Sequence, residues 1–205
     1  MDTTRYVLGV LLIVGIPPAV LYWLLIHPFV EFWRSQGPRW TFTIVGTVCT
    51  LLCFFLFRWR LWILGPDLGT NWFLIGAGVL LYGLSAWVSI LTKRQLPVRT
   101  FAGLPELTRD GSRETLLQGG IYGVVRHPRY LSVVVGTAGF AMVINYLGAY
   151  LMVLGSIPIL FLVAVLEERE LVDRFGAEYR DYRARVPAVF PRCGAWSSGQ
   201  RGDGS

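Results

Sequence analysis

The sequence is poor in charged residues. Asp, Glu, Lys and Arg make up 16% of its 205 residues, whereas about a quarter of a typical soluble domain is charged. Hydrophobic residues make up 54% of the chain, and they are collected in long blocks. This distribution argues against an ordinary soluble domain and indicates an integral membrane protein.

Several common functional signatures are absent. The sequence contains no P-loop, no Gly-rich dinucleotide fingerprint, no HExxH zinc motif and no Ser-His-Asp order. It has two histidines, and its three cysteines have neither disulfide-framework nor zinc-ligand spacing. Cys49 and Cys53 lie one helical turn apart in an apolar block, where we expect them to pack as small hydrophobic residues. We therefore predict no metal site.

Five apolar blocks approach the roughly 20 residues that a helix needs to cross the hydrocarbon core of a bilayer. They are Val7–Ile26, Trp40–Phe57, Trp72–Leu91, Leu131–Asn145 and Leu147–Leu166. Pro17 and Pro18 lie inside the first block, and we expect them to kink one helix rather than divide it. The sequence thus predicts an all-α integral membrane protein with about five transmembrane helices, the last two forming a tight hairpin.

Lysines and arginines are distributed unevenly between the two faces that five spans define. The segments after the first, third and fifth spans carry two, seven and seven of the 19 Lys and Arg residues, and the opposite face carries Arg5, Arg58 and Arg60. Because cytoplasmic loops are enriched in Lys and Arg, we expect the N-terminus outside and the C-terminus in the cytoplasm. No basic run alternates with aromatics as a nucleic-acid groove requires, so we predict no nucleic-acid partner.

Composition divides the chain into three parts. Residues 1–91 hold the first three spans, and the Gly/Ser-rich residues 193–205 are predicted to be a disordered tail. Residues 92–192 between them hold a cytoplasmic loop, the hairpin 131–166 and an amphipathic helix. That helix is predicted over Glu167–Tyr182, where apolar and aromatic residues recur at three- and four-residue spacing.

The hairpin returns the chain to the membrane face that it left, which brings two polar stretches together. "RHPRY" (126–130) precedes the fourth span, and "EERE" (167–170) follows the fifth. These residues also have purely structural explanations. Arginines beside a span can be orientation signals, and an interfacial tyrosine can be part of an aromatic belt. We interpret His27, at the end of the first span, as a structural residue and not as a ligand. Carboxylates at a helix C-terminus nevertheless oppose the helix dipole, so the combination favours a pocket for a polar, zwitterionic molecule.

The order and spacing of these stretches resemble those of a known family. "GGIYGVVRHPRYLS", a short hairpin and "LEERELVDRFGAEYRDYRARVPAVFPR" together resemble the membrane-embedded isoprenylcysteine carboxyl methyltransferases, over about residues 107–192. The chain is similar too to the related phospholipid N-methyltransferases and small-thiol S-methyltransferases. The resemblance implies S-adenosylmethionine as cofactor on the cytosolic side and a lipophilic acceptor that enters from the bilayer.

The resemblance also implies which residues bind the cofactor. The expected contacts are Glu114, Thr115, Leu116, Leu117, Tyr122, Arg126, His127, Pro128, Arg129, Tyr130 and Glu167. Two positions depart from the family pattern. Ser132 stands where a glycine is common, and Val163 stands where the prenylcysteine enzymes carry a substrate-side arginine. The second departure leaves the acceptor open among a prenylcysteine-like carboxyl, a small thiol and a lipid amine.

Methyl transfer from a sulfonium needs little acid–base chemistry, so we expect positioning and exclusion of water to be the main contributions. No catalytic residue is assigned, although Glu168 and His127 are candidates if the acceptor must lose a proton. Two other hypotheses remain: a nicotinamide-dependent lipid or sterol reductase-like enzyme, and a non-catalytic scaffold that binds anionic lipid. Nothing in the sequence indicates the oligomeric state.

Overall fold

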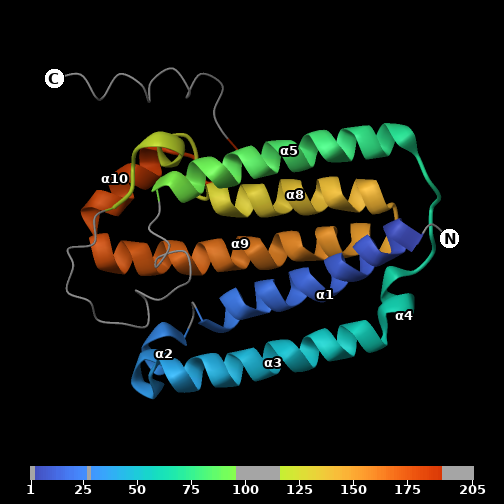
Figure 1. The fold of residues 1–205 in the computed structure, drawn as a ribbon. Coiled ribbons are helices and arrows are strands. Elements are labelled where there is room, and N and C mark those ends of the chain that lie inside the picture. The colour runs from blue at the N-terminus through green and yellow to red at the C-terminus, as the bar shows by residue number, and fades with distance from the viewer. Residues whose placement is uncertain (1–2, 27–28, 96–115, 191–205) are drawn as a thin grey trace.

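The computed structural model describes residues 3–26, 29–95 and 116–190, most of which are helical (Figure 1). The elements are α1 (Thr3–Ile26), α2 (Val30–Gln36), α3 (Pro38–Arg58), α4 (Arg60–Leu64), α5 (Trp72–Gln95), the 3₁₀ helix η2 (Gly120–Gly123), α8 (Pro128–Ile144), α9 (Leu147–Phe175) and α10 (Ala177–Arg185). One isolated antiparallel bridge joins Asp67 to Tyr146. The predicted all-α fold is confirmed.

Each predicted apolar block forms a helix. α1, α3, α5 and α9 are long and apolar enough to cross a membrane, and α8 is a shorter apolar helix of 17 residues. At 1.5 Å per residue α8 measures about 25 Å, slightly less than the hydrocarbon core. α9 has 29 residues and continues beyond the apolar block that ends at Leu166. The charged turns of α9 after Leu166 therefore lie outside the apolar span.

The long helices run side by side, and the bundle has two distinct ends (Figure 1). The α10 end also carries the C-terminus of α5 and the N-terminus of α8, whereas the α4 end carries the N-terminus of α1 and the turn between α8 and α9. Asn145 makes that turn in the left-handed conformation, with φ 52°. The predicted tight hairpin is thus present, and it returns the chain to the α10 end.

Small residues let α5 and α8 approach each other closely. A Cβ added to Gly78 would lie 2.5 Å from the carbonyl oxygen of Gly139, and one added to Gly139 would lie 2.6 Å from that of Gly78. Further towards the α10 end, the hydroxyl of Ser85 donates to the carbonyl of Ser132 at 2.7 Å. Such close contacts between small residues stabilise helix pairs in a bilayer, where apolar burial contributes little. They fix the start of α8, and with it the "RHPRY" stretch, against α5.

Both prolines of α1 lie within one continuous helix, as predicted. In a regular helix the N–H of residue 18 donates to the carbonyl of Val14. Proline has no N–H, so this carbonyl lacks its usual helical donor. The thiol of Cys53 on α3 lies 3.6 Å from this carbonyl oxygen, and that of Cys49 lies 3.6 Å from the carbonyl oxygen of Pro18. These cysteines therefore do more than pack, because their thiols donate to backbone carbonyls beside the prolines.

The prediction of one amphipathic helix over Glu167–Tyr182 is wrong. The first part of that stretch is the end of α9, and the chain then turns at Gly176, which has a φ of 57° that favours glycine. A separate helix, α10, follows. The expected apolar positions nevertheless gather, since buried Tyr179 and Tyr182 pack with Leu171, Val172 and Phe175. The turn at Gly176 folds α10 back onto the last turns of α9.

Candidate active site

The "RHPRY" stretch enters α8 through a proline. Pro128 occupies the first turn, where its missing N–H has no helical partner to lose, and His127 is the preceding residue. The backbone N–H groups of Arg126 and His127 donate to the carbonyls of Pro187 and Ala188, each at 2.9 Å. The segment that follows α10 is thereby held against the start of α8.

Glu168 on α9 binds cations from two other segments. Its Oε1 accepts from Nη2 of Arg126 at 2.7 Å and lies 3.0 Å from Nε2 of His127. Its Oε2 lies 3.3 Å from Nε of Arg183 on α10. The Glu168 side chain is only 10% exposed, and a carboxylate that buried is costly unless it is paired and hydrogen-bonded. Glu168 therefore joins α9, α10 and the start of α8.

The rest of the Arg126 guanidinium binds carbonyls at the C-terminal end of α10. Its Nη1 donates to the carbonyl of Arg183 at 2.9 Å and also to the carbonyl of Val186. Its Nε and Nη2 both donate to Glu168. All three guanidinium nitrogens thus bond to protein groups. Arg126, which the resemblance places among the cofactor contacts, therefore joins the start of α8 to α9 and α10.

Glu167 has a different environment from its neighbour. Its Oε2 accepts a hydrogen bond from the hydroxyl of Tyr130 at 2.8 Å and lies 3.6 Å from Nδ1 of His127. The rings of His127 and Tyr130 are stacked, with centroids 5.4 Å apart and planes 30° apart. The Glu167 side chain is 32% exposed. One carboxylate of the pair is therefore buried among cations, and the other is accessible beside two rings.

The two carboxylates set the charge of His127. Burial alone lowers the pKa of the imidazole, but hydrogen bonds and charges from Glu167 and Glu168 outweigh it and raise the pKa to about 9. Burial alone raises the pKa of Glu168, but hydrogen bonds and charges from His127 and Arg126 outweigh it and lower the pKa to about 2. At neutral pH the cluster therefore contains an imidazolium beside an ionised Glu168.

Tyrosines from η2 and α10 line the same end of the bundle. The hydroxyl of Tyr182 donates to the carbonyl of Tyr122 at 2.7 Å, which fixes η2 to α10. Burial, together with the charge of Glu167, raises the pKa of Tyr122 to about 12. Leu116 packs against the apolar cluster around Tyr182, and Leu117 is exposed. The phenol of Tyr122 therefore stays neutral at physiological pH.

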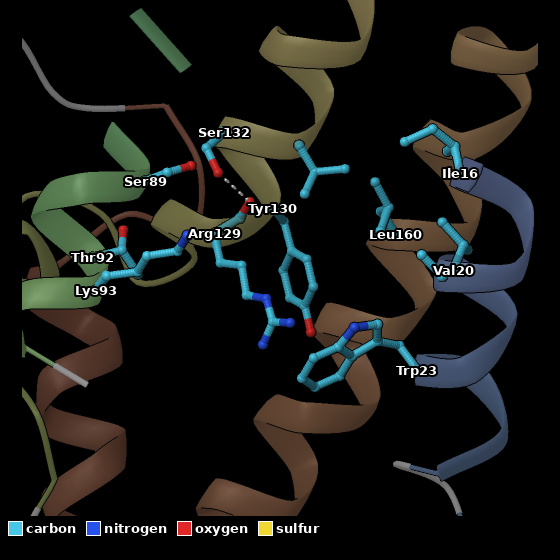
Figure 2. Close-up of a pocket in the computed structure, with 12 residues that line it drawn as sticks. Ile16, Val20, Trp23, Ser89, Thr92, Lys93, Arg129, Tyr130, Ser132 and Leu160 are labelled. Atoms are coloured by element: carbon cyan, nitrogen blue, oxygen red, sulfur yellow. Dashed lines mark hydrogen bonds between the residues drawn. The ribbon is translucent and has the colours of Figure 1, made fainter. Parts of the chain in front are cut away.

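A cavity of about 260 Å³ adjoins this cluster, between α1, α5, α8 and α9 (Figure 2). It is lined by Ile16, Ala19, Val20, Trp23, Ser89, Thr92, Lys93, Arg129, Tyr130, Ser132, Val133 and Leu160. The guanidinium carbon of Arg129 lies 3.7 Å from the centroid of the Trp23 ring. Tyr130 connects the carboxylate cluster to the cavity, because its hydroxyl bonds to Glu167 and its side chain lines the cavity.

A family model described as phospholipid methyltransferase matches residues 73–178, more than half of the chain. The chain belongs to the phospholipid methyltransferase family. The match runs from α5 into α10, so it contains His127, Tyr130, Glu167 and Glu168. The resemblance read from the motifs is therefore confirmed at the level of the family.

Three curated relatives are methanethiol S-methyltransferases. That of Pseudomonas deceptionensis is 29% identical over 177 residues, which cover 80% of this chain and 64% of the relative. Methanethiol S-methyltransferase 1 of Bradyrhizobium diazoefficiens is 28% identical over 174 residues, covering 78% and 57%. Methanethiol S-methyltransferase 2 of the same organism is 38% identical over 72 residues, covering 35% and 27%. The chain thus spans less than two thirds of these relatives, and no solved structure matches it.

The structure brings together most of the residues that the family motifs indicate. His127, Tyr130 and Glu167 are in direct contact, and the charge of Glu167 helps to raise the pKa of Tyr122. Pro128 is buried at the start of α8, and Arg129 faces the cavity. Glu114 and Thr115 lie outside the described residues, as do His27, Cys193 and the predicted tail 193–205.

Sequence reasoning missed three parts of the site. Trp23 reaches the cavity from α1, Arg183 reaches Glu168 from α10, and residues 187–188 bond to the backbone before α8. Trp23 looked like one aromatic among many in an apolar span, and Arg183 like one of several cytoplasmic arginines. The carbonyls of Pro187 and Ala188 have no side-chain signature that could have revealed their role.

Proposed function

We propose that the chain is an S-adenosylmethionine-dependent membrane methyltransferase that acts on a small thiol. Glu167 carries this proposal, because it is an accessible carboxylate that bonds to a tyrosine hydroxyl, beside stacked rings and close to the cavity that Tyr130 lines. Membership of the phospholipid methyltransferase family supports methyl transfer. The names of the three relatives support sulfur as the accepting atom over a lipid amine or a prenylcysteine carboxyl.

The residues present suit the proposed donor. When bound, S-adenosylmethionine supplies an electrophilic methyl group on a cationic sulfur, and it also carries an ammonium, a ribose diol and a purine. The Glu167 carboxylate can accept hydrogen bonds from the ammonium or the diol. The rings of Tyr122 and Tyr130 can contact the purine or a cation, and the His127 imidazolium can stack on the purine. We assign these four residues to donor binding, with Leu116 and Leu117 on the segment that leads to η2.

We assign neither of the two candidate bases a role in proton transfer. Glu168 is held by Arg126, His127 and Arg183, and a carboxylate with a pKa of about 2 is a weak base. His127 already carries a proton at neutral pH. Both residues keep Glu167 and Tyr130 in place. The chain itself then contributes orientation and exclusion of water, which suit a displacement with little proton transfer.

We place the α10 end in the cytoplasm and the N-terminus outside. Lys93 and Arg94 end α5 at the α10 end, whereas Arg58 and Arg60 lie at the α4 end. Single cysteines introduced by Arg180→Cys and Leu68→Cys in a cysteine-free background test this placement. A membrane-impermeant maleimide should label the Leu68 site in intact cells and the Arg180 site only after permeabilisation. The reverse pattern would refute the orientation.

Calorimetric titration of the purified chain in detergent tests donor binding. Wild-type protein should bind S-adenosylmethionine, and Glu167→Gln should weaken binding by about tenfold or more, since a charge-assisted hydrogen bond contributes about 1.5–3 kcal/mol. Asp173→Asn is the matched control, because it makes the same chemical change at an exposed position of α9. No binding to wild type would end the proposal, and binding of a nicotinamide nucleotide instead would favour a reductase.

A further inference from the structure

We propose that the cavity between α1, α5, α8 and α9 is the site of the methyl acceptor, and that Arg129 makes this site selective for an acceptor bound as an anion. The inference rests on the proposed function and adds what binds the second substrate. It assigns Arg129 to the acceptor, whereas the family motif places this residue in the cofactor segment.

The dimensions and walls of the cavity suit a small apolar molecule. Its volume of about 260 Å³ is below the roughly 300–1,000 Å³ of typical ligand pockets. Ile16, Val20 and Leu160 form part of an apolar wall between α1 and α9 (Figure 2). A short alkyl or aryl thiol fits such a space.

Tyr130 is shared by the cavity and the proposed donor site. Tyr130 lines the cavity, and its hydroxyl bonds to Glu167 at 2.8 Å. Val163 is fully buried in the apolar cluster that contains Tyr130 and Leu160. The position at which prenylcysteine enzymes are expected to carry an arginine is therefore apolar here, and positive charge for the acceptor must come from another residue.

Arg129 on α8 supplies positive charge at the cavity. Its guanidinium lies against the Trp23 ring, and the two side chains stand with the Tyr130 hydroxyl at one end of the cavity (Figure 2). A cation over an aromatic face is held in place by the charge distribution of the ring. Lys93 also lines the cavity from α5. An anionic sulfur is stabilised near such groups, whereas the ammonium form of an amine is repelled.

This arrangement removes the need for a protein base. A cation near a titrating thiol lowers its pKa, because it favours the charged form. The thiol then loses its proton to water, and the negative sulfur remains opposite the Arg129 guanidinium. Glu168 and His127 need take no part, in agreement with their engagement elsewhere in the cluster.

Thiophenol is a suitable probe, because its thiolate absorbs ultraviolet light differently from the thiol. Difference absorbance during a pH titration, without methyl donor, reports the pKa of thiophenol bound to the detergent-solubilised chain. We expect this pKa to lie about one unit below that in empty micelles. Arg129→Gln should remove most of the shift, with Lys93 accounting for the remainder, and Val20→Trp, which fills the cavity, should abolish the bound signal. Arg94→Gln is the control, because it removes a neighbouring cation that does not line the cavity.

Equal pKa values in wild type and micelles, or an unchanged shift in Arg129→Gln, would overturn the proposal. Val20→Phe replaces Val20→Trp if the larger residue prevents folding, as judged by size-exclusion chromatography. Calorimetry with S-adenosylmethionine on the same variants separates the two proposals. A thiophenol shift without donor binding would refute the proposed function but not this site, whereas loss of donor binding in Arg129→Gln would return Arg129 to the cofactor.

Discussion

Each end of the bundle ties its helices together through an arginine and a carboxylate. At the α4 end, Arg5 is 5% exposed and donates to Asp67 and, at 2.9 Å, to the hydroxyl of Thr70. At the α10 end, Arg126 donates to Glu168 and to two carbonyls. Both arginines join segments that are distant in sequence, and both lie near a membrane surface where unpaired charge is costly.

The two ends differ in how their carboxylates are used. Asp67 accepts from Arg5 and from the backbone N–H of Gly69. The α10 end has two adjacent carboxylates, and Glu168 takes the bonds to Arg126, which leaves Glu167 bonded to a tyrosine hydroxyl beside a cavity. A polar cluster at a membrane surface is thus a candidate ligand site when one of its carboxylates is accessible and the cluster adjoins a cavity.

The largest expected effect is on stability at the α10 end. Glu168→Gln leaves Arg126, Arg183 and the His127 imidazolium without their shared anion, so the free energy of unfolding should fall by about 3–5 kcal/mol. Thermal unfolding in detergent measures the change. Glu167→Gln is the matched control and should cost much less. Equal losses in the two variants would show that the carboxylates do not have separate roles.

The pH dependence of stability should come from the same end. The folded pKa of His127, about 9, lies above its ordinary 6.5. Its contribution is therefore fully present below about pH 6.5 and is lost as the pH rises through 9, a change of about 3 kcal/mol. Thermal unfolding between pH 6 and 10 should show this loss in wild type relative to His127→Gln. A constant difference between the two proteins would contradict the assigned charge.

A substitution at the α4 end should lower stability without changing the affinity for S-adenosylmethionine. Asp67→Asn leaves the buried Arg5 without its anion, and we expect a loss of about 2 kcal/mol in the free energy of unfolding. The affinity for S-adenosylmethionine should stay within about twofold of wild type, because Asp67 lies at the other end of the bundle. A large loss of affinity in this variant, measured by calorimetry, would remove the distinction between the ends.

The smallest effect is expected between the ends, where α1 contacts α3. Pro18 leaves the carbonyl of Val14 without a helical donor, and the Cys53 thiol donates to it instead. Cys53→Ala removes this thiol and should lower the free energy of unfolding by less than about 1 kcal/mol. Cys53→Ser keeps a donor at the same position and should cost less than alanine. Unfolding midpoints of the two variants decide this, and the reverse order would show that apolar packing matters more than the hydrogen bond.

Much of the fold was predictable because apolar runs directly reflect the bilayer. The five blocks became helices with boundaries shifted by a few residues, and α9 extended furthest beyond its block. The contact of "RHPRY" with "EERE" followed from the hairpin alone. The break at Gly176 was missed because the residues around it keep helical periodicity, and only the φ of 57° reveals the turn.

The separate roles of neighbouring residues in the site were not predictable from the sequence. Glu167 and Glu168 are adjacent and identical in sequence terms, and only the packing of α10 decides that Glu168 is the one paired with Arg126 and Arg183. Arg126 and Arg129 flank the same motif, yet one ties helices and the other faces the cavity. Such assignments depend on how α8, α9 and α10 pack against one another, which the periodicity of a single helix does not specify.

Methyl transfer itself tests the central claim most directly. Membranes that contain the chain receive S-adenosylmethionine with a deuterated methyl group, together with methanethiol, and mass spectrometry follows labelled dimethyl sulfide. Wild type and Asp67→Asn should form the product at similar rates, and Glu167→Gln should form less than about a tenth as much, matching its expected loss of donor binding. Absence of labelled product from wild type, or equal product from Glu167→Gln, would contradict the account.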